Sequence, residues 1–588
     1  MAGLTSSLSI ATSSLMFNQA VMSTISHNLA NVNNPNYSRQ QVQAQAQSIG
    51  GISAGVTINK VSRQVDQQIL EQLTKQQSIS SYNDSRQQYM AGLDLLFGTP
   101  SSTSGIGNVM SNFFDELNNL SSYPDSTSQR QSVVQQASFL SDQLNSINAQ
   151  LKQQERDIDN VVDDTISTVN AALKSIGELN VKVAQLENSN IPGQNANDLR
   201  DERQRQINIV ADALSVNVHE DAFGRAIITT DSGQVLVDSN YTQLERSAPD
   251  PGSSFAGIGI RSLKSDGTPA NTLLQLRTDR LGGGSIKALT EVRDTELEKY
   301  VAQADELSRT LIEQVNQIHS RGVGVPPPSS LTSQKLTTAG TDLFSEIGLV
   351  PGSSFDVSVV DKTTGAPAYT TTVTLPAVGP FSGANLATTI NTALTGAGFP
   401  ASVTASFTNG QLTVADSSST YGVVMGNDAD DFLGKIVMNP FFDGSGSADI
   451  AVRQDIIADP GLLAAAQMRS SDGGLSLNDS RNAVALAGLG TSDVAFNAAG
   501  GVTAQLDTFS GYISTLTAKL AVTLQDNSTR VDYNQTLLTD LQTRNSAASG
   551  VNTDEELANL VTFQNAFQAS SKVIQIVDKL YDSLLSLV

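Results

Sequence analysis

Each end of this chain carries a stripe of apolar residues that repeats with the three-and-four spacing of a coiled coil, and these two stripes limit the folds that the chain can adopt. A helix carrying such a stripe alone would expose apolar surface to water, at roughly 25 cal/mol per Å². Each helix therefore needs a partner, and the sequence predicts that the two ends pair. The stripes comprise Leu4, Leu8, Ala11, Leu15, Asn18, Met22, Ile25 and Leu29 at the front, and Leu560, Phe563, Phe567, Ser570, Ile574, Val577, Tyr581, Leu584 and Val588 at the back.

Turn and capping residues place the inner ends of both helices. The run Asn31-Val32-Asn33-Asn34-Pro35 combines residues that tolerate a left-handed conformation with a proline, so the first helix is expected to end near Asn31. The run Thr553-Asp554-Glu555-Glu556 has the pattern of a capping box, with carboxylates in the first helical turn. The last helix is therefore predicted to begin there.

Ordinary core packing within one molecule is the alternative explanation of these stripes. Two observations favour contacts between molecules instead. Residues 1–38 contain no Asp, Glu, Lys or Arg, and the face opposite each stripe carries mostly Ser, Thr, Asn and Gln. Helices of this kind can pack on every side.

The region between the ends is predicted to be mainly helical, with two β-rich insertions. Helices are expected from Ser126 to about Asn190, from Asp198 to Leu214, and along an apolar stripe from Leu297 to Ile318. Alternating residues predict strands over residues 216–237. Residues 355–414 read as strand, strand, helix, strand, strand, with a hairpin turn at Asn409-Gly410.

These elements predict a fold class and four domains. The expected fold is mainly α with β-rich insertions, in an elongated multidomain protein whose terminal helices pair as a coiled coil. The predicted domains are a terminal helical domain (residues 1–33 and 553–588), a helical trunk (34–214, 281–325 and 455–552), a β-rich domain (215–280) and an inserted α+β outer domain (331–450).

Composition excludes several classes of function. The formal net charge of −23 would repel nucleic acid and anionic lipid, so neither is an expected partner. The chain has no cysteine, which removes disulfides, thiolate metal ligands and a thiol nucleophile. We find no classical signal peptide and no stretch of about 18 apolar residues that would predict insertion in a membrane.

The residues that could carry chemistry form no convincing site. His27, His219 and His319 fall in three different predicted elements, and Phe223 stands where a zinc-protease motif beginning at His219 would need its second histidine. Asp231-Ser232-Gly233 fits a hairpin turn better than a serine nucleophile. The acidic run 427–431 lacks the ligand spacing of a calcium loop. We therefore predict no catalytic, cofactor or metal site.

Motifs at both ends resemble the flagellar rod, hook and hook-associated family, and most closely its hook-filament junction members. Residues 26–40 read SHNLANVNNPNYSRQ, in which Asn31, Pro35, Tyr37 and Arg39 fall in the family signature, with Asn replacing a Thr and a Gly. Residues 549–570 are similar to the terminal motif of the junction proteins. Shorter similarities lie at residues 197–203, 441–445, 456–460 and 478–483, whereas residues 331–431 show little resemblance.

This resemblance implies a structural role without catalysis. The family implies export through the flagellar type III apparatus, with a chaperone on the C-terminal helix, and a secreted product located in the extracellular flagellum. It also implies self-association in a helical lattice, with the hook protein and the second junction protein as neighbours. Two alternatives stay open: another axial component such as the hook protein or the second junction protein, or a secreted adhesin or hydrolase that uses the insertion at residues 331–431.

Overall fold

The computed structural model divides the chain into two compact units. The terminal unit comprises Met1–Met90, Arg156–Thr295 and Leu524–Val588, and the internal unit comprises Ala91–Glu155 and Glu296–Thr523. The structure describes residues 2–49, 52–98, 105–188, 195–263, 268–269, 272–336, 342–418, 420–428 and 430–586.

Long helices and small antiparallel sheets make up the terminal unit, and the helices α5 (Thr127–Glu187) and α14 (Phe509–Ser549) contribute residues to both units. The other elements of this unit are α1 (Ala2–Ala30), β1 (Gln40–Ile49), β2 (Ile52–Arg63), α2 (Gln67–Met90), α6 (Asn197–Ala213), β3 (Val216–Glu220), β4 (Ala226–Thr230), β5 (Val235–Val237), β6 (Thr242–Ser247), β7 (Gly257–Ser262), β8 (Leu274–Leu276), the short helix η1 (Thr278–Arg280), α7 (Ser285–Glu291), the π-helical turn η2 (Val292–Glu296) and α15 (Thr553–Leu585).

The internal unit mixes short strands with helices. Its elements are α3 (Leu93–Phe97), α4 (Ile106–Ser122), α8 (Leu297–His319), β9 (Ser330–Thr332), α9 (Leu343–Glu346), β10 (Ser354–Asp361), β11 (Pro367–Thr374), α10 (Gly383–Gly396), β12 (Val403–Thr408), β13 (Gln411–Asp416), β14 (Tyr421–Gly426), α11 (Phe432–Lys435), β15 (Phe442–Asp443), β16 (Ala451–Val452), α12 (Gln454–Ala458), η3 (Pro460–Leu462), α13 (Arg481–Gly488), β17 (Val494–Phe496) and β18 (Gln505–Asp507). The prediction of a mainly α fold with β-rich insertions is confirmed.

The long helices follow the sequence prediction closely. The expected helices over residues 126–190, 198–214 and 297–318 correspond to α5, α6 and α8. The Ser126 hydroxyl accepts a hydrogen bond from the Gln129 amide at 3.3 Å, as a helix N-cap should. The predicted stripe of α8 is buried from Leu297 through Val315.

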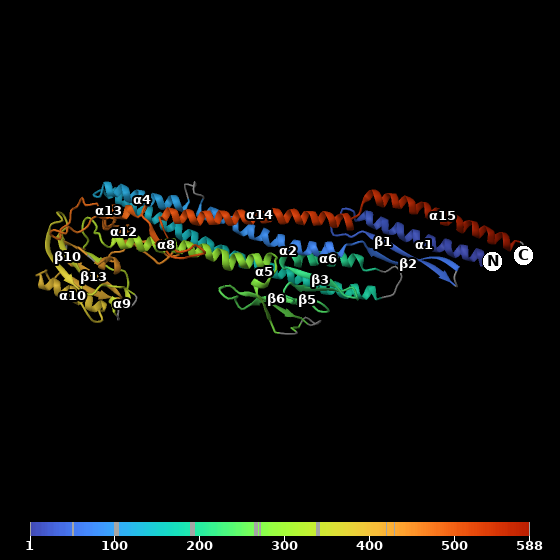
Figure 1. Cartoon of the computed structure of the whole chain (residues 1–588), viewed down its shortest axis with the longest axis horizontal. Coiled ribbons are helices and arrows are strands. Elements are labelled where there is room, and N and C mark those ends of the chain that lie inside the picture. Colours follow the sequence, from blue (N-terminus) through green and yellow to red (C-terminus); the bar gives the residue numbers. More distant parts are fainter. Residues whose placement is uncertain are drawn as a thin grey trace. The chain divides into compact units, whose positions relative to one another are not determined.

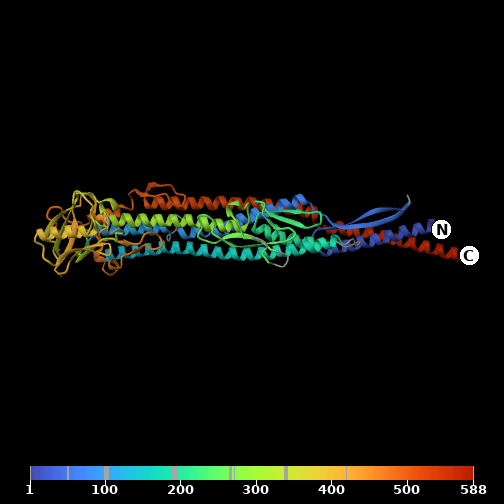
Figure 2. The same cartoon turned by 90° about the horizontal axis from the view of Figure 1, so that it is seen from below.

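A β-hairpin stands where residues 34–214 were predicted to be helical trunk. Strands β1 and β2 pair antiparallel, with Gln40 opposite Arg63, and β2 packs against α1. Figures 1 and 2 both show this hairpin running beside α1. The alternation of Gln with Val and Ala from Gln40 to Gln47 is a strand pattern. The hairpin is a β element that the prediction of a mainly helical trunk did not include.

The predicted strands of both insertions are confirmed. Strands β3, β4 and β5 form one sheet, with the turn at residues 231–233 between β4 and β5. In the internal unit, strands β10, β11, β12 and β13 surround α10 in the predicted order. Asn409 and Gly410 join β12 to β13 with positive φ angles of 54° and 85°, which a type I′ turn requires.

The insertion builds its own hydrophobic core from two three-stranded sheets. The sheet orders are β11-β10-β14 and β12-β13-β9, and α10 contacts β11, β12 and β13. In the core, the ring of Phe355 stacks on Phe432 with centroids 4.1 Å apart. Both rings are almost fully buried, so this part of the chain is stabilised by packing.

The run Gly282-Gly283-Gly284 is of the kind that predicts a hinge, but in the structure it packs closely against neighbouring segments. Gly284 has φ of +90°, and a Cβ built there would lie 2.3 Å from the carbonyl oxygen of Ala213. Its amide donates to the Ser78 carbonyl oxygen at 3.0 Å. The run is glycine because neighbouring backbone passes too close for a side chain.

His319, on α8, is a buried and neutral structural histidine. Its Nδ1 lies 2.7 Å from the carbonyl oxygen of Asn439, and its Nε2 accepts from the Ala464 amide at 2.9 Å. Nδ1 therefore carries the proton in this arrangement. Burial lowers the pKa of His319 to about 4, because a charged imidazolium would lose its water.

This burial predicts that acid weakens the internal unit. An unfolded histidine binds a proton near pH 6.5, whereas His319 in the folded chain resists protonation until about pH 4. The free energy of unfolding should therefore be highest above about pH 6.5 and fall towards pH 4, by up to about 3 kcal/mol. Urea unfolding of the parent and of His319→Gln at pH 7 and 4.5 measures this contribution. An equal fall in both chains would contradict it.

No helix in the part of the chain that the structure describes is both long and apolar enough to cross a membrane.

Candidate assembly site at the paired terminal helices

The first and last helices lie side by side, as the two stripes predicted. Figures 1 and 2 both show α1 next to α15, with the two termini at neighbouring ends. The Ser14 and Ser570 hydroxyl oxygens are 3.1 Å apart, and the rings of Phe17 and Phe563 meet edge to face at 6.1 Å. Since Asn28 lies beside Glu556, the two helices run antiparallel.

The residues predicted for the stripes are the less exposed ones on each helix. On α1, Ala11, Asn18 and Ile25 are buried, whereas Leu4, Leu8, Leu15, Met22 and Leu29 are half-buried. On α15, Val577 is buried and Leu560, Phe563, Phe567, Ser570, Ile574 and Tyr581 are half-buried. The side chains of Leu584 and Val588 lie outside the described residues. The role of these stripes in assembly stays a prediction.

A buried asparagine closes the inner end of this helix pair. Asn28 is only 1% exposed, and its amide group makes four hydrogen bonds. Its Oδ1 accepts from the Gln40 amide (3.0 Å) and the Tyr37 hydroxyl (2.8 Å). Its Nδ2 donates to the Gln40 carbonyl oxygen (3.0 Å) and to Oε2 of Glu556 (3.2 Å). Asn28 therefore joins α1, β1 and α15.

Glu556 is a buried carboxylate held by one arginine and this asparagine. Its side chain is 2% exposed, and Arg39 Nε donates to its Oε1 at 2.7 Å. The same guanidinium reaches Glu555 at 2.8 Å, although Glu555 is 54% exposed. Burial alone would lower the pKa of Arg39, but the hydrogen bonds and charges of Glu555 and Glu556 outweigh it and raise that pKa. We call Asn28, Tyr37, Arg39, Gln40 and Glu556 the joint cluster.

The joint cluster continues into helix α6. Gln40 Nε2 donates to Asp198 at 2.8 Å, and its Oε1 accepts from Asn197 at 3.2 Å. Asp201 accepts from the amide and hydroxyl of Ser38, at 3.0 and 2.8 Å, and from Arg63 of β2 at 2.7 Å. The resembling motif NDLRDER at residues 197–203 thus supplies the docking surface for the hairpin.

The remaining motif residues shape the turn between α1 and β1. Asn31 Nδ2 donates to the carbonyl oxygen of His27 at 2.9 Å, and its own carbonyl oxygen accepts from the Asn34 amide. Tyr37 lies edge to face with His27, and burial together with the charges of Asp198, Asp201 and Glu556 raises the pKa of its phenol. Asn31, Asn34, Pro35 and Tyr37 line a cavity of about 540 Å³.

The cap of α15 differs from the prediction. Asn552, not Thr553, is the N-cap, because its Oδ1 accepts from the amides of Asp554 (3.0 Å) and Glu555 (3.3 Å). The capping box placed at Thr553 was therefore wrong by one residue. Glu556 is consequently free of capping and turns towards Arg39 and Asn28.

The groups considered for chemistry are separated or already paired. His27 lies in α1, His219 in β3 and His319 in the core of the internal unit. Asp431 accepts from Arg321 and from Gln317, which leaves it a poor calcium ligand. Across the described residues, no group of three or more His, Asp or Glu side chains has the arrangement of a metal site.

Comparison with known proteins gives consistent matches over the whole chain. Residues 90–329 match the family model described as "Flagellar hook-associated protein FlgK helical domain", and residues 543–587 match "Flagellar basal body rod FlgEFG protein C-terminal". Flagellar hook-associated protein 1 of Escherichia coli is 26% identical over 593 residues, covering 98% of both chains. The chain is therefore similar to flagellar hook-associated protein 1 over nearly its whole length.

Two further curated relatives and one solved structure also resemble the chain. The Salmonella typhimurium protein of the same name is 26% identical and covers 98% of this chain and 99% of its own length. The Bacillus subtilis protein is 22% identical, with 98% and 97% covered. The solved flagellar hook junction protein FlgK of Burkholderia pseudomallei is 17% identical with a TM-score of 0.49, covering 81% of this chain and 99% of its own.

Sequence reasoning found the motif of this family but missed what its residues do. Asn28, Gln40 and Asp201 were not singled out, although they form many of the buried contacts. Glu556 was expected only to cap its own helix. Asn28 stands next to the stripe residue Leu29 and is not itself in the stripe, so no local pattern indicated that it is buried. No local pattern marks Glu556, since its partner Arg39 is 517 residues away in sequence.

Proposed function

We propose that the chain is a structural subunit of the bacterial flagellum that forms the junction between hook and filament. Relatives of nearly the same length carry the name flagellar hook-associated protein 1, which supports this position rather than that of another axial component. The subunit self-associates in the axial structure through its terminal helices. The elongated arrangement and the four domains predicted from the sequence belong to this proposal.

One observation carries the assembly mechanism: α15 has exposed apolar side chains that α1 does not cover. At 3.6 residues per turn, Val561 and Ile576 lie on the side away from the stripe that faces α1, and Leu580 lies at the edge of that stripe. They are 58%, 57% and 46% exposed. An exposed apolar face of this kind marks a contact with another molecule. Neighbouring copies of the same helix pair are the proposed contact.

The proposal includes partners on both sides and an export step. The hook protein is the neighbour on one side and the second junction protein on the other. A flagellar export chaperone covers α15 before the chain is secreted through the type III apparatus, which would shield its apolar faces. Neither nucleic acid nor membrane insertion is part of this role, and the family is structural rather than enzymatic.

Electron microscopy of cells that lack the chain tests the junction role. We expect bare hooks, with filament subunits released into the medium, and restored filaments when the full chain is supplied from a plasmid. Filaments of normal length on the deleted cells would overturn the proposal.

A further inference from the structure

The apolar stripes by themselves do not fix how α1 and α15 align. The spacing repeats every seven residues, so sliding one helix by a heptad again places apolar residues against apolar residues. In coiled coils, charges flanking the seam normally exclude such slips. Here residues 1–38 contain no Asp, Glu, Lys or Arg. The charged residues of α15, such as Lys572 and Asp578, therefore have no such partner on α1 that would select one alignment.

The joint cluster supplies what the stripes lack. A one-heptad slip would move Glu556 by about 10 Å along the helix axis, since the rise is about 1.5 Å per residue. Glu556, 2% exposed, would then lose Arg39 and Asn28 together. An unpaired buried carboxylate is strongly destabilising. Asn28, in contrast, would keep its hydrogen bonds to Gln40 and lose only the hydrogen bond to Glu556 of α15.

The reference point of this alignment is the folded part of the terminal unit. Gln40 is fixed by Asn197 and Asp198 of α6, and Arg39 donates its amide to the Ser549 carbonyl oxygen at 2.8 Å. Gln64 then donates its amide to the Arg39 carbonyl oxygen at 2.8 Å. Arg39 and Asn28 are thus held by contacts with α6, the hairpin and the end of α14 that do not involve α15.

We infer that Asn28, Arg39 and Glu556 form a register lock, which selects one alignment of the terminal helices from several that the apolar stripes allow. This inference rests on the proposed function, because a lattice built from helix pairs needs every copy to present the same outer face. A pair slipped by one heptad would place Val561 and Ile576 one heptad away from their contacts in the neighbouring copies.

Disulfide trapping in the purified full chain tests the lock, and the absence of native cysteine makes the reporters unambiguous. The pair Ser14→Cys and Ser570→Cys reports the observed register, because these hydroxyls are 3.1 Å apart. Ser570→Cys with Ser7→Cys, or with Val21→Cys, reports a slip of one heptad in either direction. Non-reducing electrophoresis after mild oxidation gives the yield of each bond.

We expect only the 14–570 bond in the parent chain. In Glu556→Ala, the yield of a slipped bond should rise by at least about tenfold, the change that 1.4 kcal/mol produces. Glu555→Ala is the matched control, since it removes an exposed partner of the same arginine and should leave the register unchanged. Glu556→Gln keeps the shape of the side chain and one acceptor oxygen, so its yield of the slipped bond should lie between those of the parent and Glu556→Ala. This variant serves as the test if Glu556→Ala loses helicity.

The outcomes separate the lock from the proposed function. An unslipped 14–570 bond of parent yield in both Glu556→Ala and Glu556→Gln would overturn the lock while leaving the helix pair intact. Equal slipping in Glu555→Ala would also overturn it, because the effect would not depend on the buried carboxylate. Absence of the 14–570 bond in the parent chain would reject the pairing on which the proposed function rests.

Discussion

Cells whose only copy carries Phe563→Asp are expected to lose attached filaments. Phe563 is half-buried against α1, with its ring edge to face with Phe17 at 6.1 Å. Aspartate there would remove this contact and place a charge between two helices, and α1 has no Lys or Arg to pair with it. Burying such an unpaired charge costs several kcal/mol, which a pair of half-exposed helices cannot offset.

The effect should be visible in the purified chain as well as on the cell. Hydrogen exchange in α1 and α15 should quicken at least about a hundredfold in Phe563→Asp, which corresponds to roughly 3 kcal/mol. Phe563→Leu keeps an apolar side chain and is the control, with near-normal exchange and normal filaments. Attached filaments of parental number on Phe563→Asp cells would show that this stripe is not needed for assembly.

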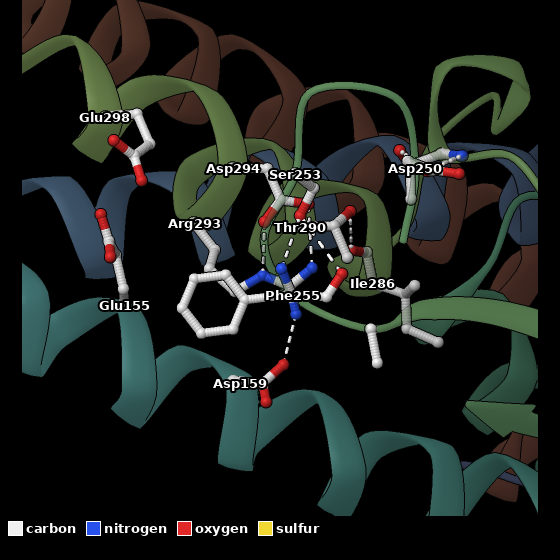
Figure 3. A network of polar contacts seen from close by, with 12 residues as sticks. Glu155, Asp159, Asp250, Ser253, Phe255, Ile286, Thr290, Arg293, Asp294 and Glu298 are labelled. Carbon is white, nitrogen blue, oxygen red and sulfur yellow. Dashed lines mark hydrogen bonds and ion pairs between the residues drawn. The ribbon is translucent and has the colours of Figure 1, made fainter. Parts of the chain in front are cut away.

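Arg293→Ala should destabilise the terminal unit more than any change on its surface. Figure 3 shows Arg293 on the π-helical turn between two carboxylates and the ring of Phe255. Its side chain is 1% exposed, donates to Asp294 through Nε (2.6 Å) and Nη2 (2.9 Å), and pairs with Asp159. The guanidinium carbon lies 4.7 Å from the Phe255 ring centroid.

Removing this guanidinium leaves Asp294, 14% exposed, without its partner. We expect a loss of about 3 kcal/mol, measured as faster hydrogen exchange in α7 and in strands β6 and β7. Arg246 also donates to Asp159, at 2.9 Å, so the loss falls mainly on Asp294. Arg280→Ala, at an exposed position, is the control and should exchange like the parent. Arg293→Lys should recover little, since one ammonium cannot replace the planar fork.

Parental exchange in Arg293→Ala would show that the cluster contributes no stability. That result would also show that the ion pairs of Arg293 do not stabilise the π-helical turn. The terminal helix pair should be unaffected by either change, because Phe17 and Phe563 lie in other elements.

The sequence predicted those features that depend on neighbouring residues. Period and capping were enough to locate the long helices, and the Asn409-Gly410 pair was enough to place a hairpin turn, because each follows from local backbone preferences. The pairing of the termini could be predicted because each stripe needs a partner of the same kind. The hairpin over residues 40–63 was missed, since its Gln-rich alternation has little apolar contrast.

Contacts between distant residues could not be predicted in the same way. Glu556 was interpreted as a capping carboxylate, which its position in the first turn of α15 supports, yet it pairs with Arg39. The glycines at 282–284 looked flexible, whereas Ala213 and Ser78 pack against them. In both cases the contact that determines the role of the residue comes from a segment that is distant in sequence and lies close only in the folded chain.

Immunogold electron microscopy of intact flagella tests whether the chain lies at the junction between hook and filament. An epitope inserted after Gly379 would be accessible, since residues 376–380 are exposed and a Cβ at Gly379 meets no neighbouring atom within 4 Å. We expect one narrow band of gold at the boundary between hook and filament on motile cells. Gold spread along the filament or along the hook, or confined to the cell body, would contradict it.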